Sequence, residues 1–167
     1  MKKLSLLLLS VCLLFVLSSC SKKSTPSPNV TGTITVTIDG SVQKFNVSAT
    51  ANIKNISGVN IVSIFGAEGT GSTNTIAISV VNPSITAGTT YTGVGSQVQI
   101  SYTLASGAVY QYADDDGAAF ATVLVKSVSS TNIQGTFSGN LNLISGTGAA
   151  KEILSNGTFN LNVVSAN

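Results

Sequence analysis

The sequence predicts an all-β protein of antiparallel strands, and three observations support this. Beyond residue 30, apolar and polar residues alternate with period two in one segment after another, as in strands with one buried face. Pairs suited to tight turns, such as Asp39-Gly40, separate these segments. No stretch shows a helical period, so we expect about nine strands in an antiparallel β-sandwich or a lipocalin-like closed β-barrel. Alternation does not separate these architectures, and the sandwich is our first expectation.

The first two segments predict a β-hairpin. In Thr33 to Ile38 the aliphatic residues share one face and the threonines share the other. Asp39-Gly40 follows, a pair that tolerates the positive φ angles of a two-residue hairpin turn. Residues 45–53 then alternate again, beginning with Phe45 on the apolar face. We therefore expect these segments to pair across the turn.

The middle of the chain predicts four further strands. Residues 59–65 and 76–81 are more continuously apolar, which is expected of strands covered on both faces. Pro83 ends the second of them, because proline cannot donate to a strand ladder. Residues 98–104 alternate regularly. Residues 120–128 are mostly apolar and are predicted to form a central strand.

The last two segments have the clearest alternation, and they resemble each other. Residues 133–143 and 158–163 each place aliphatic and aromatic residues against Asn, Gln, Ser and Thr. Gly135-Thr136-Phe137 in the first is echoed by Gly157-Thr158-Phe159 in the second. One echo does not establish a repeat architecture, which needs a fixed period over several units. We interpret the two segments as neighbouring strands that face one core.

The N-terminus predicts export and a lipid anchor. Met1-Lys2-Lys3 precedes an apolar run from Leu4 to Leu17, whose 14 residues would span only about 21 Å as a helix, short of the roughly 30 Å of a bilayer core. Such a run is typical of a signal peptide. The following Leu17-Ser18-Ser19-Cys20 resembles the lipobox of bacterial lipoproteins. That resemblance implies cleavage after residue 19 and triacylation of Cys20, with several acyl chains giving a stable anchor.

The remaining chain divides into a tether and one domain. Residues 20–29 hold the lipidated cysteine and a segment of Ser, Thr, Lys, Pro and Asn with no apolar residue, which is typical of a flexible tether. Residues 30–167 are numerous enough for one β domain with a sizeable core.

Composition excludes several function classes. The chain has 8 basic and 6 acidic residues, and since four of the lysines precede residue 24, the rest carries four lysines against six acids, or −2. Without a basic cluster we expect no nucleic-acid partner. The chain has no His, and Cys12 leaves with the signal while Cys20 is acylated. Serine or cysteine triads and zinc sites built from His and Cys are therefore excluded, and we expect no enzyme.

Two clusters are candidate binding residues. Asp114, Asp115 and Asp116 precede a glycine and offer hard oxygen ligands to Ca²⁺, although the alternative is a solvated loop. Tyr110 and Tyr112 share one strand face and are candidates for stacking against a glycan, although tyrosine is also common in strands.

Two alternative functions compete with non-catalytic binding. A glycoside or other hydrolase needs two carboxylates in one cleft, which Glu68 and Glu152, or either of them with the Asp114–Asp116 triplet, would have to supply. A carrier of a small apolar ligand needs a barrel with an internal cavity. The side chains expected to line that cavity are Phe45, Ile100, Phe137 and Phe159.

Short motifs in the mature chain resemble the all-β lipoproteins common in Bacteroidota. These are the early Asp39-Gly40 turn, the G-T-F-S motif of residues 135–138 and the N-G-x-F motif of residues 156–159. The resemblance implies a lipoprotein of the bacterial cell envelope, in the outer membrane and facing the periplasm or the surface, with a β-sandwich-like domain. It carries no activity and no site residues. The sequence therefore predicts a non-catalytic binding or structural role, with a glycan or an envelope protein as partner.

Overall fold

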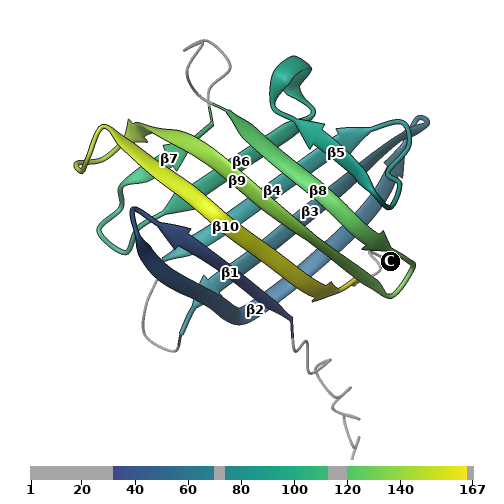
Figure 1. Ribbon diagram of the computed structural model, residues 1–167, viewed down its shortest axis with the longest axis horizontal. Helices are drawn as coiled ribbons and strands as arrows, with labels where there is room; N and C mark the ends of the chain where they lie inside the picture. The colour runs from purple at the N-terminus through teal and green to yellow at the C-terminus, as the bar shows by residue number, and fades with distance from the viewer. Residues whose placement is uncertain (1–31, 70–73, 113–119, 165–167) are drawn as a thin grey trace, which may run out of the picture.

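The computed structural model describes residues 32–69, 74–112 and 120–164 (Figure 1). This part of the chain forms strands joined by short connections, with one 3₁₀ turn, η1 (Val94–Ser96). No helix within it is long and apolar enough to cross a bilayer. The strands are β1 (Thr33–Ile38), β2 (Ser41–Ile56), β3 (Val59–Glu68), β4 (Thr75–Asn82), β5 (Thr89–Thr92), β6 (Val98–Thr103), β7 (Val109–Gln111), β8 (Ala121–Val128), β9 (Asn132–Ser145) and β10 (Lys151–Asn162).

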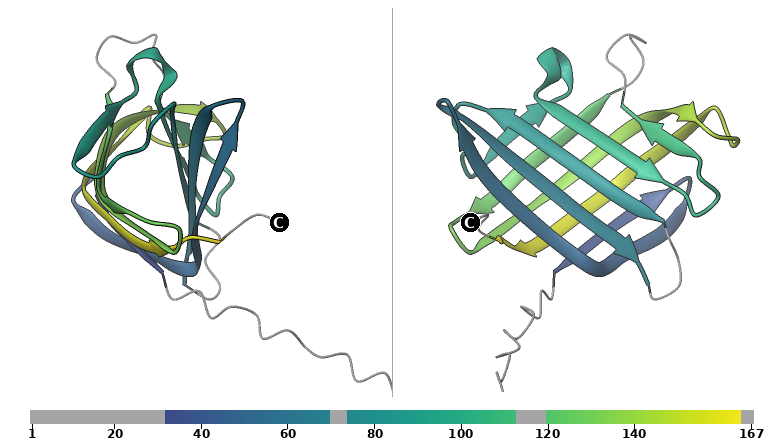
Figure 2. Two further views of the ribbon diagram at one scale, coloured as in Figure 1. Left: turned by 90° about the vertical axis from the view of Figure 1, so that its right-hand side faces the viewer. Right: turned by 180° about the vertical axis from the view of Figure 1, so that it is seen from behind.

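The strands close into an antiparallel barrel. Neighbours follow the order β10-β1-β2-β3-β4-β6-β7-β9, and β10 also pairs with β9, which completes a ring of eight strands. β7 pairs only with the C-terminal end of β9, so β8 pairs along the N-terminal part of the same edge, and β5 pairs with β8 (Figure 2). The predicted all-β antiparallel class is confirmed. Of the two predicted architectures the closed barrel is present, in place of the sandwich, because β10 has a partner on both edges and the sheet does not divide into two layers.

The first hairpin forms as predicted. Asp39 and Gly40 have φ angles of 45° and 83°, the two positive values that a type I′ turn requires. Ile34 pairs with Phe45 across the hairpin, and both side chains are fully buried. The predicted hairpin is therefore confirmed, with its apolar face in the core.

The prediction that some strands are covered on both faces was wrong. Burial alternates along β3, β4 and β8, and Phe65 on the outer face of β3 is 42% exposed. The wall of a barrel has protein on its inner side and solvent on its outer side, so apolar residues at outward positions remain exposed. β8 is also not central, since it lies between β9 and the terminal strand β5.

The inward side chains of the strands fill the barrel with a single apolar core. Within the described ranges no polar or charged residue is in the buried class, and the core includes four tyrosines. The four side chains expected to line an internal cavity are all packed in the core, each 3% exposed or less: Phe45, Ile100, Phe137 and Phe159.

The sequence echo between the last two strands is explained by their pairing. β9 and β10 run antiparallel, so the two Gly-Thr-Phe tripeptides lie opposite each other in reversed order. Each phenylalanine therefore covers the glycine of the other strand, and a Cβ at either glycine would overlap a ring. The opposed pairs are Gly135 with Phe159, Thr136 with Thr158, and Phe137 with Gly157.

The packing of each phenylalanine on the opposite glycine predicts that alanine substitution has different effects at two glycines of β9. A methyl group at Gly135 would overlap the Leu124 carbonyl and the Phe159 ring, whereas one at Gly139 would lie 3.1 Å from the Phe120 carbonyl and 3.4 Å from Ile100. We expect Gly135→Ala to lower the free energy of unfolding by about 1–3 kcal/mol, as overpacking does, and Gly139→Ala to lower it by less than about 1 kcal/mol. Urea unfolding followed by circular dichroism measures both. Equal losses of unfolding free energy in the two variants would contradict this packing of phenylalanine on glycine.

Candidate functional site

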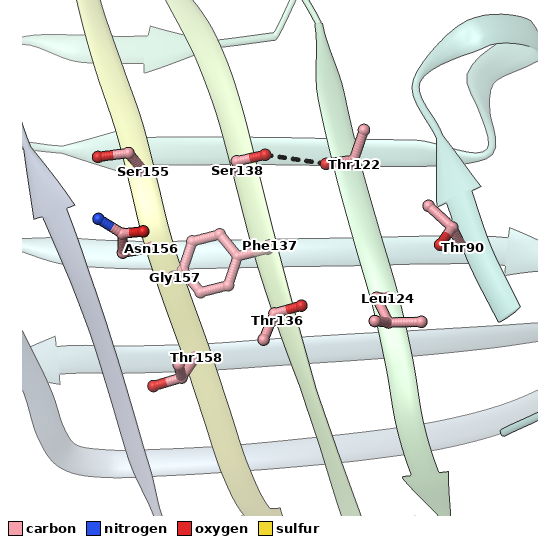
Figure 3. Close-up of a pocket in the computed structure, with 10 residues that line it drawn as sticks. All are labelled: Thr90, Thr122, Leu124, Thr136, Phe137, Ser138, Ser155, Asn156, Gly157 and Thr158. Atoms are coloured by element: carbon pink, nitrogen blue, oxygen red, sulfur yellow. Dashed lines mark hydrogen bonds between the residues drawn. The ribbon is translucent and has the colours of Figure 1, made fainter. Parts of the chain in front are cut away.

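An open hollow of about 670 Å³ lies on the outer wall of the barrel. Four neighbouring strands contribute to it, and Figure 3 shows its side chains spread across them. Its lining consists of Thr90 from β5, Thr122 and Leu124 from β8, Thr136, Phe137 and Ser138 from β9, and Ser155, Asn156, Gly157 and Thr158 from β10.

Strand register sets the hydroxyl groups in rows across the wall. Thr136 of β9 lies opposite Thr158 of β10, and Thr158 lies opposite Thr35 of β1. On the other side Thr136 lies opposite Leu124, which lies opposite Thr90. Adjacent strands are about 4.8 Å apart, so the row presents side chains at a regular spacing. The sequence predicted these threonines as a polar face but not their alignment.

A second row includes a direct hydrogen bond. The hydroxyl groups of Thr122 and Ser138 lie 2.9 Å apart, shown by the dashed line in Figure 3. Ser138 and its neighbours on β9 face a bulge in β10, where the register shifts between Leu154 and Gly157. Bulges redirect side chains from the regular alternation. Here the bulge lets both Ser155 and Asn156 line the hollow, and Asn156 has a φ angle of 52°.

The lining is neutral and rich in hydrogen-bonding groups. It holds six hydroxyl side chains and one amide, together with Leu124, while Phe137 is a core residue that contributes little exposed surface. Hydroxyl and amide groups both donate and accept hydrogen bonds. No charged side chain lines the hollow. The arrangement therefore matches an uncharged ligand with many hydroxyl groups better than an anion or a cation.

The tyrosines proposed for glycan stacking lie elsewhere. Tyr110 is fully buried and Tyr112 is 6% exposed, and both point into the core. Tyr110 stacks on Tyr102 with ring centroids 6.3 Å apart. The two rings therefore do not form an exposed platform, because their strand parity directs them to the inside of the barrel. Substituting either with alanine would test packing and not binding.

Other predicted site residues lie outside the described part of the chain. These are Cys20 and the candidate calcium ligands Asp114, Asp115 and Asp116. Among the residues that the structure does describe, no group of three or more His, Cys, Asp or Glu side chains is placed to hold a metal ion.

At one end of the barrel, carboxylate charges act on two tyrosine hydroxyls: those of Glu68 and Glu152 on Tyr102, and those of Glu152 and Asp39 on Tyr110. We call these five residues the acidic mouth. This is the end that carries the β1–β2 and β9–β10 turns, on the left in Figure 1. Glu68 and Glu152, the carboxylates that the hydrolase alternative would pair, both affect the same hydroxyl: their charges raise the pKa of Tyr102. The closer partner of Glu152 is Asp39, which the sequence indicated only as a turn residue.

Burial and neighbouring charges raise the pKa values of three groups in the acidic mouth. Burial, followed by the Glu68, Glu152 and Tyr110 charges, raises the pKa of Tyr102 to about 12. Burial and the Glu152 charge also raise the pKa of Tyr110. The pKa of Glu152 is itself raised, first by burial and then by its hydrogen bond to Asp39 and the charge of that carboxylate.

The raised pKa of Glu152 predicts how stability depends on pH. The folded chain binds this proton more tightly than the unfolded chain, so the contribution of Glu152 is full below its ordinary pKa and is lost as pH rises through the raised value. We expect Glu152→Gln to be more stable than wild type near neutral pH, with a difference that shrinks towards about pH 4. Urea unfolding across this range measures it.

Asp39→Asn provides an independent check. It removes the neighbour that raises the pKa of Glu152, so it is expected to flatten the same part of the stability profile. A Glu152→Gln variant that is less stable than wild type near neutral pH, and equally so at acid pH, would contradict this account.

Comparisons with known proteins gave no match. No protein-family model matches the chain, no curated protein matches it, and no solved structure matches it.

Proposed function

We propose that this protein is a lipoprotein of the bacterial envelope, anchored through Cys20, that binds a neutral glycan in the hollow on its outer wall. The anchor is inferred from the lipobox-like residues 17–20. The proposed role is binding without catalysis, since the chain contains no His and no Arg.

The observation that carries this proposal is the neutral, hydroxyl-rich lining of the hollow. An anion would lack a basic partner there, and a purely apolar ligand would cover hydroxyl groups without satisfying them, which costs about 1–3 kcal/mol for each buried group. A sugar replaces the water on those hydroxyls with its own hydroxyl groups. Leu124 supplies an apolar contact of the kind that the carbon face of a sugar ring needs.

The hollow is built on strands and not on mobile loops. Thr122, Thr136 and Thr158 lie on three consecutive strands of the barrel wall, so their spacing is fixed by the backbone ladder. Side chains ordered before binding lose less conformational freedom when a ligand arrives. No Tyr or Trp side chain lines the hollow, so affinity would come mainly from hydrogen bonds, each worth about 0.5–1.5 kcal/mol.

The interior of the barrel is a weaker candidate for binding. Carriers of apolar ligands also use closed barrels, which this chain forms. The side chains expected to line a cavity are instead packed in the core, and Phe45 contacts Tyr102 edge to face with ring centroids 6.2 Å apart. The outer hollow is therefore the better supported site.

The glycan proposal is tested with threonine-to-valine changes that keep the β-branched shape. On a glycan array the full chain is expected to bind neutral oligosaccharides. The Thr136→Val/Thr158→Val double variant is expected to lose about tenfold in affinity, because two hydrogen-bonding groups are removed. Thr50→Val on β2, outside the hollow, is the matched control.

Two results would contradict glycan binding at this site. An array with no signal would exclude the ligand class. A double variant that binds as tightly as wild type and Thr50→Val would exclude the hollow.

The anchor is tested separately at Cys20. Cys20→Ser is expected to abolish incorporation of labelled fatty acid and to prevent cleavage after residue 19, since the acylated side chain is missing. Metabolic labelling and the mass of the mature chain measure both effects. Unchanged lipid incorporation in Cys20→Ser would contradict the proposed anchor, and protease treatment of intact cells distinguishes periplasmic from surface exposure.

A further inference from the structure

We infer that the hollow is one part of a longer site, whose ligand is a linear, neutral oligosaccharide that lies across the strands from β5 to β1. This inference rests on the proposed function, and it adds the form of the glycan and its direction on the barrel wall. The residue that extends the site beyond the hollow is Thr35 of β1, which is half-buried and does not line the hollow.

One row of outward side chains crosses five neighbouring strands. Thr90 of β5 lies opposite Leu124 of β8, which lies opposite Thr136 of β9. Thr136 lies opposite Thr158 of β10, and Thr158 lies opposite Thr35 of β1. We call these five residues the threonine row. Figure 3 shows four of them, from Thr158 to Thr90, on successive strands.

The threonine row is longer than a single sugar. Adjacent strands are about 4.8 Å apart, so the row from β5 to β1 is about 19 Å long. A pyranose ring is comparable in width to one strand spacing, so a monosaccharide contacts only one or two of these side chains at a time. A chain of about four sugars is needed to contact the whole row.

The polar groups on either side of the row are bonded to one another. On the side nearer the acidic mouth, the hydroxyls of Thr122 and Ser138 lie 2.9 Å apart. On the other side, Asn132 Nδ2 donates to Asn160 Oδ1 at 3.0 Å, and Gln134 Nε2 donates to Asn132 Oδ1 at 3.0 Å. Within the described part of the chain, no such bond joins the hydroxyls of the threonine row. These hydroxyls are therefore better placed to bond a ligand, and they lead across the strands and not along them.

The row also fits a chain of uncharged sugars. Thr35 lies opposite Lys44 of β2, the first charged side chain along the row, and at the other end the strand order stops at β5. Leu124 gives one apolar position between hydroxyls on both sides. A sugar chain presents hydroxyl edges and C–H faces in turn, and threonine hydroxyls both donate and accept hydrogen bonds.

Affinity is therefore expected to rise with the length of the oligosaccharide. The probes are neutral linear oligosaccharides of glucose and of mannose, from the disaccharide to the hexasaccharide, titrated into the full chain in mild detergent. Each added sugar that reaches a further hydroxyl is expected to raise affinity about threefold to tenfold, until about four sugars fill the row. Isothermal titration calorimetry measures this dependence.

Thr35→Val tests the part of the row that lies outside the hollow. The change removes one hydroxyl and keeps the β-branched shape. It is expected to lower affinity for the hexasaccharide about threefold to tenfold and to leave affinity for the disaccharide, which occupies the hollow, unchanged. Thr33→Val and Thr37→Val change the threonines on either side of Thr35 on the same face of β1, and they are the matched controls. Thermal unfolding shows that each variant is folded.

Three outcomes would overturn this inference, and they differ in what they say of the proposed function. Equal affinity for short and long oligosaccharides, with both weakened in Thr136→Val/Thr158→Val, would leave a glycan site in the hollow and remove the longer row. A loss in Thr33→Val or Thr37→Val as large as that in Thr35→Val would overturn the direction across the strands. Failure of the wild type to bind any oligosaccharide would overturn the row and the glycan proposal together.

Discussion

The structure depends on the pairing of β10 with two partners at once. β10 binds β9 through the reciprocal glycine and phenylalanine contacts, and it binds β1 from Thr33 opposite Asn160 to Ile38 opposite Leu154. Without it, β1 and β9 would each present a free edge, and the inward residues of both strands would be open to water. The hollow and the acidic mouth both include residues of β10, so both exist only in the closed barrel.

Much of the fold was predictable from local patterns. The alternation in residues 33–38 and the Asp39-Gly40 pair define a hairpin because strand period and turn geometry act between neighbours in the sequence. Closure was not predictable in this way, since it depends on pairing between the first and last strands, and period two is the same in a sandwich. The apolar outward position of Phe65 similarly gave the mistaken impression of a strand covered on both faces.

The candidate sites were less predictable than the fold. The sequence identified the polar faces that carry Thr136 and Thr158, but their alignment with Thr90 and the bulge at Asn156 follow from register. Tyr110 was expected to be exposed because alternation shows which residues share a face but not which face is inside. Asp39 fits its turn so well that nothing in the sequence indicated a second role beside Glu152.

Closure by β10 also has a consequence for the order of folding. Thr33 pairs with Asn160, so the ring cannot be completed until nearly the whole chain is available. Contacts between such distant residues slow folding, because a long loop must be ordered before they form. A chain that is threaded through a membrane from its N-terminus would therefore remain open until its last strand emerges, and the barrel would then assemble on the far side in a single late step.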